Sequence, residues 1–239
     1  MNTVKIDKYF RGMIAHRGLS GIETENTINA FVAAGNRSYF GIECDIRASK
    51  DNKLMVIHDD TLLRLGLLNL YVPSFKYDEI RKFTLVDRKS GNLSDSVTIP
   101  LLSEYLTICK TYQKIAFIEC KNTLSFEHLD MLLGEIDKYY DISNVVVISF
   151  HEKYLTYLRK QRPEIVLYYL TWTMDDHVFE LCENNQINLD IDYKQIDEAT
   201  IKKYHLIGLK VAVYTVDDKE IAEKLIKLGV DFITTNILE

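Results

Sequence analysis

The chain is poor in the residues that break or cross-link a fold, since its 239 residues include only three prolines and four cysteines. It has no Gly/Ser-rich or low-complexity stretch that would indicate a linker. Its apolar runs are strand-sized, which excludes a transmembrane helix. The amino-terminal segment MNTVKIDKYFRG lacks the apolar core of a secretory signal. These absences predict one globular domain over 1–239, located in the cytoplasm and without stable membrane insertion.

A basic excess is also missing, because the formal net charge is −6. A protein that binds nucleic acid needs positive charge to meet the phosphate backbone, so we exclude that class. Lys and Arg are scattered, which argues against a basic membrane-binding patch. The cysteines form no CxxC pair, and a zinc ribbon or redox motif is therefore not expected. We interpret them as reduced, buried, small apolar residues: Cys44, Cys109, Cys120 and Cys182. Nothing in the sequence indicates an oligomeric state.

The chain does contain a regular alternation of strand and helix patterns, with enough hydrophobic residues (47%) for a substantial core. Strands are predicted near residues 14, 43, 117, 147, 167, 190, 213 and 232, and residues 54–59 extend the second. Helices are predicted at 25–37, 103–112, 126–139, 152–161, 175–185, 197–206 and 218–228. Eight such units are typical of an α/β fold, the (β/α)8 TIM-type barrel. A doubly wound sheet is the alternative, but the Gly-rich first turn that often marks it is absent.

The segment 60–100 follows the second strand and its extension and is long, polar and irregular. A structureless loop of that length is uncommon in a compact domain. We therefore predict a small insertion at 60–100, with a function or a fold of its own.

Polar side chains gather at the predicted strand ends, where barrels of this type have their active sites. Glu43 and Asp45 share one strand face, because side chains alternate along a strand. Glu119 and Lys121 share a face of the next strand in the same way. If both faces point inward, three carboxylates meet, and they cannot all stay ionised without a positive partner. Such oxygen ligands suit a hard divalent cation, Mg²⁺ or Ca²⁺. A structural ion-pair network without a metal is the alternative interpretation.

Arg17 and Lys121 add positive charge to this region, and a divalent cation with Arg and Lys is what a phosphate group requires. His16 and His58 each follow a strand, which makes them candidates for general acid and general base near neutral pH. Asp59 is next to His58 in the sequence and is a candidate to orient its imidazole.

Two further pairs of polar residues are interpreted as structural. Glu25 and Asn26 are expected at a helix start, with Thr24 or Asn26 as the capping residue. Asp190 and Asp192 share a strand face, and we expect hydrogen bonding at the barrel mouth from them rather than a place in the site.

Five short motifs occur in register along the chain: H-R-G at 16–18, E-N-T at 25–27, E-C-D at 43–45, H-D at 58–59 and E-C-K at 119–121. Weaker motifs are I-P-L-L at 99–102, S-F at 149–150, Y-T-V-D at 214–217 and G-V-D-F-I-T-T-N at 229–236. In their order and spacing the chain resembles the glycerophosphodiester phosphodiesterase family over nearly its whole length.

The resemblance implies a TIM-type barrel enzyme that hydrolyses a small-molecule substrate, a glycerophosphodiester, to glycerol 3-phosphate and an alcohol with a divalent cation. By position, the metal ligands correspond to Glu43, Asp45 and Glu119, the phosphate-binding residues to Arg17 and Lys121, and the acid–base pair to His16 and His58. The insertion 60–100 corresponds to the family's segment that borders the substrate cleft. Which histidine is the acid stays open, as does whether water or the glycerol 2-hydroxyl is the nucleophile.

The chain departs from the family at three positions, where Thr24 replaces Pro, Tyr214 replaces Trp and Asn236 replaces Asp. The change at Tyr214 points to a different head group of the substrate. One alternative function is hydrolysis or cyclisation of larger diesters, as by a lysophospholipase D-like enzyme, and the leucines between 62 and 70 favour it. A non-catalytic binding module is the other alternative, and the filled catalytic positions argue against it.

Overall fold

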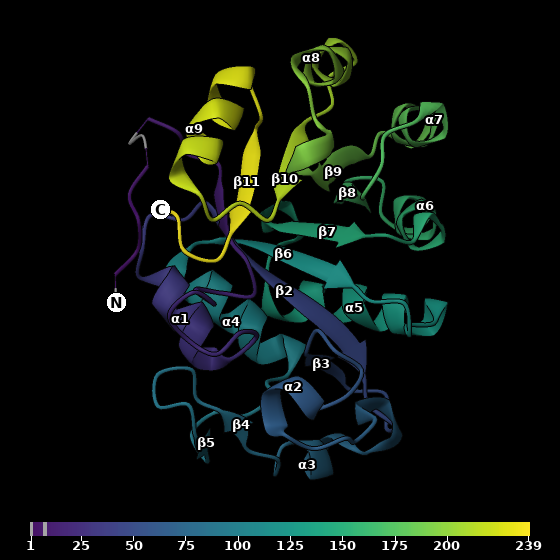
Figure 1. Cartoon of the computed structure of the whole chain (residues 1–239). Helices are drawn as coiled ribbons and strands as arrows, with labels where there is room; N and C mark the ends of the chain where they lie inside the picture. Colours follow the sequence, from purple (N-terminus) through teal and green to yellow (C-terminus); the bar gives the residue numbers. More distant parts are fainter. Residues whose placement is uncertain (1, 7–8) are drawn as a thin grey trace.

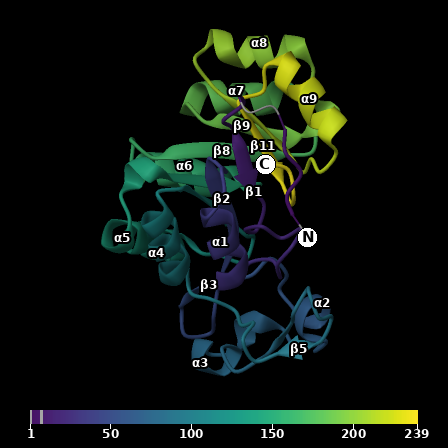
Figure 2. The same ribbon diagram turned by 90° about the vertical axis from the view of Figure 1, so that its left-hand side faces the viewer.

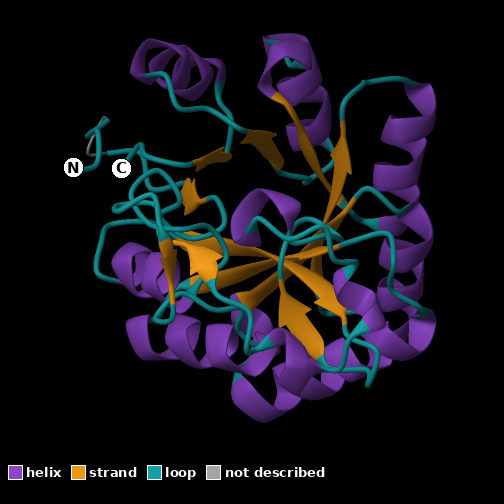
Figure 3. Cartoon of the chain, turned by 60° about the horizontal axis from the view of Figure 1, so that its bottom comes forward, coloured by secondary structure: helices purple, strands orange, loops and turns teal. Residues whose placement is uncertain are grey.

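The computed structural model describes residues 2–6 and 9–239. Among them, eight parallel strands close into a barrel, because β1 pairs with both β2 and β11. Figure 3 shows the helices outside these strands. The predicted TIM-type barrel is confirmed and the doubly wound alternative is wrong. The barrel strands are β1 (Met13–Ala15), β2 (Gly41–Ala48), β6 (Ile115–Cys120), β7 (Val145–Ser149), β8 (Val166–Thr171), β9 (Asn188–Asp192), β10 (Val211–Tyr214) and β11 (Phe232–Thr235).

Side chains of aspartate set where several of the outer helices begin. The carboxylates of Asp175, Asp197 and Asp218 each accept a hydrogen bond from a backbone N–H in the first turn of the helix that follows. Such N-caps replace hydrogen-bond partners that a helix start lacks. The helices are α1 (Ile28–Gly35), α4 (Leu102–Tyr112), α5 (Phe126–Tyr139), α6 (Glu152–Gln161), α7 (Asp176–Asn185), α8 (Glu198–Leu206) and α9 (Lys219–Leu228). Short 3-10 turns precede β7 (Ile142–Asn144) and follow β9 (Tyr193–Gln195). In the described part of the chain, no helix has the length and apolar character to cross a membrane.

The apolar core lies on both faces of the barrel strands. The larger cluster packs between strands and helices and includes Cys44 and Cys120. A smaller cluster on the other strand face, with Phe117 and Tyr168, fills the barrel interior. All four cysteines are buried and free, as predicted. Because Cys44 and Cys120 point outward, their neighbours along the two strands point into the barrel.

The segment after β2 folds around a core of its own. Strand β3 (Leu54–Val56) pairs antiparallel with β2 and leads into α2 (Leu63–Gly66), a 3-10 turn (Val72–Ser74), α3 (Tyr77–Ile80) and the strands β4 (Leu85–Val86) and β5 (Leu93–Ser94). A third apolar cluster holds these elements together: Met55, Ile57, Leu62, Val72, Tyr77, Ile80, Leu85, Val97 and Ile99. Figures 1 and 2 show α2, α3 and β5 at one end of the molecule, beyond β3 and far from α8 and α9.

Candidate active site

Three carboxylates converge at the inner face of two neighbouring strands. Asp45 of β2 lies opposite Glu119 of β6 in the parallel register, and Glu43 lies two residues earlier on the same face of β2. One oxygen of each side chain lies within 4.8 Å of the others, and all three residues are buried. The strands therefore bring together the side chains that alternation predicted to share one space.

The electrostatics of this cluster separate Asp45 from the other two acids. Burial, together with the charges of Asp45 and Glu119, raises the pKa of Glu43 well above its ordinary value. Burial and the charge of Asp45 raise the pKa of Glu119 to about 7. Burial acts in the same direction on Asp45, but Lys121 and Arg17 outweigh it and lower its pKa. Among the described residues, Glu43 Oε1 is a buried oxygen without a hydrogen-bond partner. An oxygen-only cluster with an unpartnered oxygen fits a hard divalent cation.

Two cations complete the carboxylate cluster. Lys121 Nζ lies 2.8 Å from Asp45 Oδ1 and 2.5 Å from Glu119 Oε1. Burial lowers the pKa of Lys121, but these two carboxylates outweigh it and keep the pKa raised. Arg17 Nε lies 3.3 Å from Asp45 Oδ2, and the backbone N–H of Arg17 donates to Glu43 Oε2 at 2.7 Å. Both cations thus stay charged beside the carboxylates.

The turn that presents Arg17 explains the H-R-G motif. Arg17 and Gly18 both have positive φ, 54° and 75°. A Cβ on Gly18 would lie 2.7 Å from the carbonyl carbon of Ala30 in α1. Only glycine fits so close to a helix backbone in that conformation. The glycine therefore lets the chain turn sharply enough for Arg17 to contact Glu43 and Asp45.

Asn26 lies at the start of α1 as predicted, directly before Thr27, but its side chain contacts the site and is not the cap. Its side chain donates to Asp45 Oδ2 at 2.7 Å and accepts from the Asp45 backbone N–H at 3.2 Å. The helix cap is Thr27, whose hydroxyl accepts from the Ala30 N–H. Thr24, the other predicted cap, instead donates its hydroxyl to the Val86 carbonyl, and Glu25 Oε1 accepts from Arg17 Nη1 at 2.8 Å. Through Glu25 and Asn26, the E-N-T motif therefore holds Arg17 and Asp45 in place.

His16 has its proton on a defined nitrogen. Asn236 Nδ2 donates to the acceptor-only carboxylate of Asp217 at 2.6 Å, which orients the amide. Asn236 Oδ1 then faces His16 Nδ1 at 2.8 Å and also accepts from Ser20 Oγ. Since an amide oxygen can only accept, His16 Nδ1 carries the proton and Nε2 keeps its lone pair. Burial and the nearby Arg17 charge lower the pKa of His16 to about 4.

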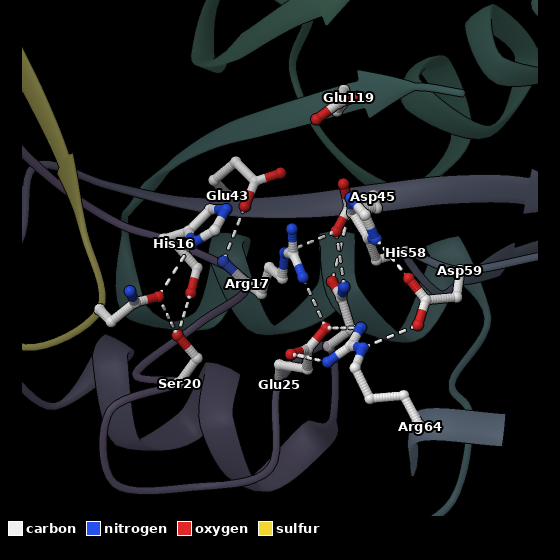
Figure 4. A network of polar contacts seen from close by, with 12 residues as sticks. His16, Arg17, Ser20, Glu25, Glu43, Asp45, His58, Asp59, Arg64 and Glu119 are labelled. Atoms are coloured by element: carbon white, nitrogen blue, oxygen red, sulfur yellow. Dashed lines mark hydrogen bonds and ion pairs between the residues drawn. The ribbon is translucent and has the colours of Figure 1, made fainter. Parts of the chain in front are cut away.

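His58 is held by a carboxylate rather than an amide. Its Nδ1 lies 2.7 Å from Asp59 Oδ1, so the predicted orienting contact is confirmed. Burial lowers the pKa of His58, while Asp45 and Asp59 oppose that shift. Figure 4 shows His16 and His58 on opposite sides of Arg17. Both imidazoles face the same cavity, which is also lined by the ionisable side chains of Arg17, Glu43, Glu119 and Lys121.

The cavity has a volume of about 250 Å³, and its remaining walls are largely apolar and aromatic. Phe150 stacks on Trp172 with ring centroids 4.2 Å apart, and Tyr214 donates to the Thr171 carbonyl at 2.7 Å. Asp190 also lines this cavity, and its Oδ1 is buried without a hydrogen-bond partner. The expectation that Asp190 hydrogen-bonds at the barrel mouth is therefore wrong. Asp192, by contrast, accepts from the Lys194 N–H at the barrel end.

Comparisons with known proteins agree with this geometry. The model of the glycerophosphoryl diester phosphodiesterase family matches residues 16–239. A glycerophosphodiester phosphodiesterase of Caldanaerobacter subterraneus subsp. tengcongensis is 31% identical over 229 residues, which cover 94% of this chain and 93% of that protein. A phosphodiesterase from Oleispira antarctica, solved with the product sn-glycerol-3-phosphate, has the same fold with a TM-score of 0.87 at 24% identity, covering 97% of this chain and 95% of the other. A glycerophosphodiester phosphodiesterase from Thermotoga maritima matches with a TM-score of 0.72 at 25% identity, covering 94% and 93%.

Proposed function

The chain belongs to the glycerophosphoryl diester phosphodiesterase family, and we propose that it hydrolyses glycerophosphodiesters to glycerol 3-phosphate and an alcohol. The observation that carries the proposal is the buried cluster of Glu43, Asp45 and Glu119 beside two histidines in one cavity. We also infer a cytoplasmic location, which the four buried, free cysteines support.

Glu43, Asp45 and Glu119 are the proposed ligands of a divalent cation, Mg²⁺ or Ca²⁺. When bound, such an ion polarises a phosphate oxygen and stabilises the negative charge of the transition state. Arg17 and Lys121 are the proposed phosphate-binding residues, since both are fixed cations at the edge of the carboxylate cluster. Their hydrogen-bonded carboxylates hold them in position before the substrate arrives, so little reorganisation is needed in the reaction.

We assign the general base to His16 and the general acid to His58. His16 donates through Nδ1 to a neutral amide, so its Nε2 lone pair is free to take a proton from the attacking hydroxyl. His58 donates through Nδ1 to the Asp59 carboxylate, which stabilises a positive imidazolium. A protonated His58 then supplies the proton that the departing alkoxide needs. The different neighbours of the two imidazoles thus support different roles.

The direct test is the release of glycerol 3-phosphate from glycerophosphocholine with Mg²⁺ or Ca²⁺, measured with and without EDTA. We expect turnover that EDTA abolishes and that added cation restores. Turnover in EDTA at the full rate would contradict the metal site. If a panel of glycerophosphodiesters gives no product with either ion, the proposed function is wrong.

One observation favours a second candidate, the hydrolysis of larger diesters such as lysophospholipids. Leucines of the segment 60–100 stand exposed around α2, with exposed fractions of 56% for Leu63, 65% for Leu67 and 42% for Leu68. Tyr71, close by in the sequence, is 48% exposed. Apolar surface of this kind fits an acyl chain or a micelle. A higher kcat/KM for lysophosphatidylcholine than for glycerophosphocholine, lost in a Leu63→Ser/Leu67→Ser variant, would establish this candidate.

A further inference from the structure

Arg64 lies outside the cavity, yet it contacts two carboxylates that contact the site. It belongs to α2 of the segment 60–100 and its side chain is 45% exposed. Its Nη1 and Nη2 donate to the two oxygens of Glu25 at 2.6 and 2.8 Å, and its Nε donates to Asp59 Oδ2 at 2.7 Å. All three nitrogens of the guanidinium are therefore used, with a two-point fork on Glu25.

Each of these carboxylates also holds a residue of the proposed machinery. Asp59 Oδ1 accepts from His58 Nδ1 at 2.7 Å. Glu25 Oε1 accepts from Arg17 Nη1 at 2.8 Å, and Arg17 in turn contacts Asp45. Figure 4 shows the two branches meeting at Arg64, one from His58 and one from Arg17. The Arg64 guanidinium thus contacts both the carboxylate that holds His58 and the carboxylate that holds Arg17.

The turn that carries Arg64 is fixed by packing and by backbone hydrogen bonds. Leu62, two residues before it, is fully buried in the separate apolar cluster of the segment 60–100. The Leu62 N–H donates to the Leu70 carbonyl at 3.1 Å, and the Gly66 N–H donates to the Leu62 carbonyl at 2.7 Å. These contacts attach the turn that carries Arg64 to the core of this segment.

The hydrogen bonds from Arg64 also act on the charge of Glu25. Burial raises the pKa of Glu25, but the hydrogen bond from Arg64 and the charge of Arg17 outweigh it, so the pKa is lowered. Without Arg64, Glu25 would keep Arg17 as its only cation partner in this network, and Asp59 Oδ2 would lose a donor. Both carboxylates would then be freer to rotate, and His58 and Arg17 would follow them.

We propose that Arg64 is a positioning residue, which couples the docking of the segment 60–100 to the orientation of the His58 imidazole and the Arg17 guanidinium. The inference rests on the proposed function, because it assigns His58 and Arg17 their roles in the reaction. The competing explanation is an ion pair that only pins the segment to the barrel. The two explanations differ in what happens to His58 when the segment stays folded.

The test compares Arg64→Gln and Arg64→Lys with Arg81→Gln. Arg81 is a matched control in the same segment, since it is 38% exposed and makes a two-point fork to Glu104 of α4 at 3.1 Å, without a contact to the site. In Arg64→Gln we expect kcat to fall about 10–100-fold, because small displacements of catalytic groups carry costs of that order. KM should rise less than kcat falls. Arg64→Lys, which replaces the fork by a single point charge, should lie between. Arg81→Gln should keep kcat within about twofold of the wild type. Its melting temperature should fall at least as much as that of Arg64→Gln.

A second measurement decides the question without turnover. At a pH at which its imidazole is neutral, the ¹⁵N resonances of the His58 ring, identified by their loss in His58→Gln, should report a single Nδ1–H tautomer in the wild type and in Arg81→Gln. In Arg64→Gln they should report a mixture of the Nδ1–H and Nε2–H tautomers, because Asp59 is no longer held in one orientation by Arg64. Unchanged His58 resonances in Arg64→Gln, or a kcat equal to that of Arg81→Gln, would overturn the proposal. If the wild type turns over no glycerophosphodiester, the proposed function fails, and the resonances still test the positioning role.

Discussion

The wall of the cavity next to β1, β2 and β6 carries charged side chains, whereas the wall next to β7, β8 and β10 is apolar and aromatic apart from Asp190 of β9. On the charged wall Asp45 contacts Arg17, Asn26 and Lys121. On the aromatic wall Trp172 is 63% exposed and is held by stacking on Phe150. A wall with fixed charges suits chemistry, because its dipoles are oriented in advance. An apolar and aromatic wall suits the choice of substrate.

The largest expected effects come from the imidazoles of the charged wall. His16→Ala and His58→Ala should each lower kcat by about 10²–10⁴-fold, the usual contribution of a general acid or base. The steady-state rate of glycerol 3-phosphate release at saturating cation measures this. A His58→Ala enzyme with near wild-type turnover would contradict the two-histidine assignment, and circular dichroism should show both variants folded.

The cations of the charged wall should contribute strongly to the free energy of unfolding of the protein. Lys121→Met removes a partner of the fully buried Asp45, and breaking a buried pair in this way costs about 3 kcal/mol of unfolding free energy. Chemical denaturation in EDTA measures the loss. Saturating Mg²⁺ should then raise the melting temperature of Lys121→Met more than that of the wild type, because the ion supplies the missing positive charge. An equal increase in both proteins would indicate that the ion does not bind at these carboxylates.

A smaller effect on stability is expected from pH. The pKa of His16 is about 4 in the folded chain against an ordinary 6.5, so the unfolded chain binds the extra proton first as the pH falls. The contribution of neutral His16 is therefore complete above pH 6.5 and is lost between pH 6.5 and 4. From pH 7 to pH 5 the loss should be about 2 kcal/mol. Denaturation in EDTA should show that His16→Gln lacks this part of the pH dependence. The exposed His177→Gln, as a reference, should retain it, and equal slopes in all three proteins would refute the assignment.

The smallest effects should come from the aromatic wall. Trp172→Ala and Tyr214→Trp should leave kcat for glycerophosphocholine within about threefold, because neither ring contacts the charged groups by a hydrogen bond, and such stacking contributes about 1 kcal/mol. The ratio of kcat/KM values between head groups, such as choline and ethanolamine, should change instead. A hundredfold loss of kcat in Trp172→Ala would contradict the assignment of chemistry to the charged wall and of substrate choice to the aromatic wall.

Periodicity was sufficient to predict the barrel and the meeting of the three carboxylates. Strand alternation placed Glu43 and Asp45 on one face, and the parallel register with β6 then made Glu119 their neighbour. It failed at Asn26, because an asparagine before an apolar helix is equally typical of a cap. Periodicity also missed Arg64, because the irregular segment 60–100 has no repeating pattern that would place this side chain. Asp190 was misplaced because the pattern of a strand does not tell whether a buried carboxylate finds a partner.

The sequence by itself therefore determined the order of strands and helices and the residue types at each strand end. Those depend on local periodicity, which is a short-range property that repeats along the chain. Only the tertiary structure decided which nitrogen of each histidine is protonated and which carboxylates hold Arg17. These features depend on contacts such as Asn236 with His16 and Arg64 with Glu25, which join residues 220 and 39 positions apart. Hydrogen bonds over such separations are specified by the packed fold, and no local pattern encodes their geometry.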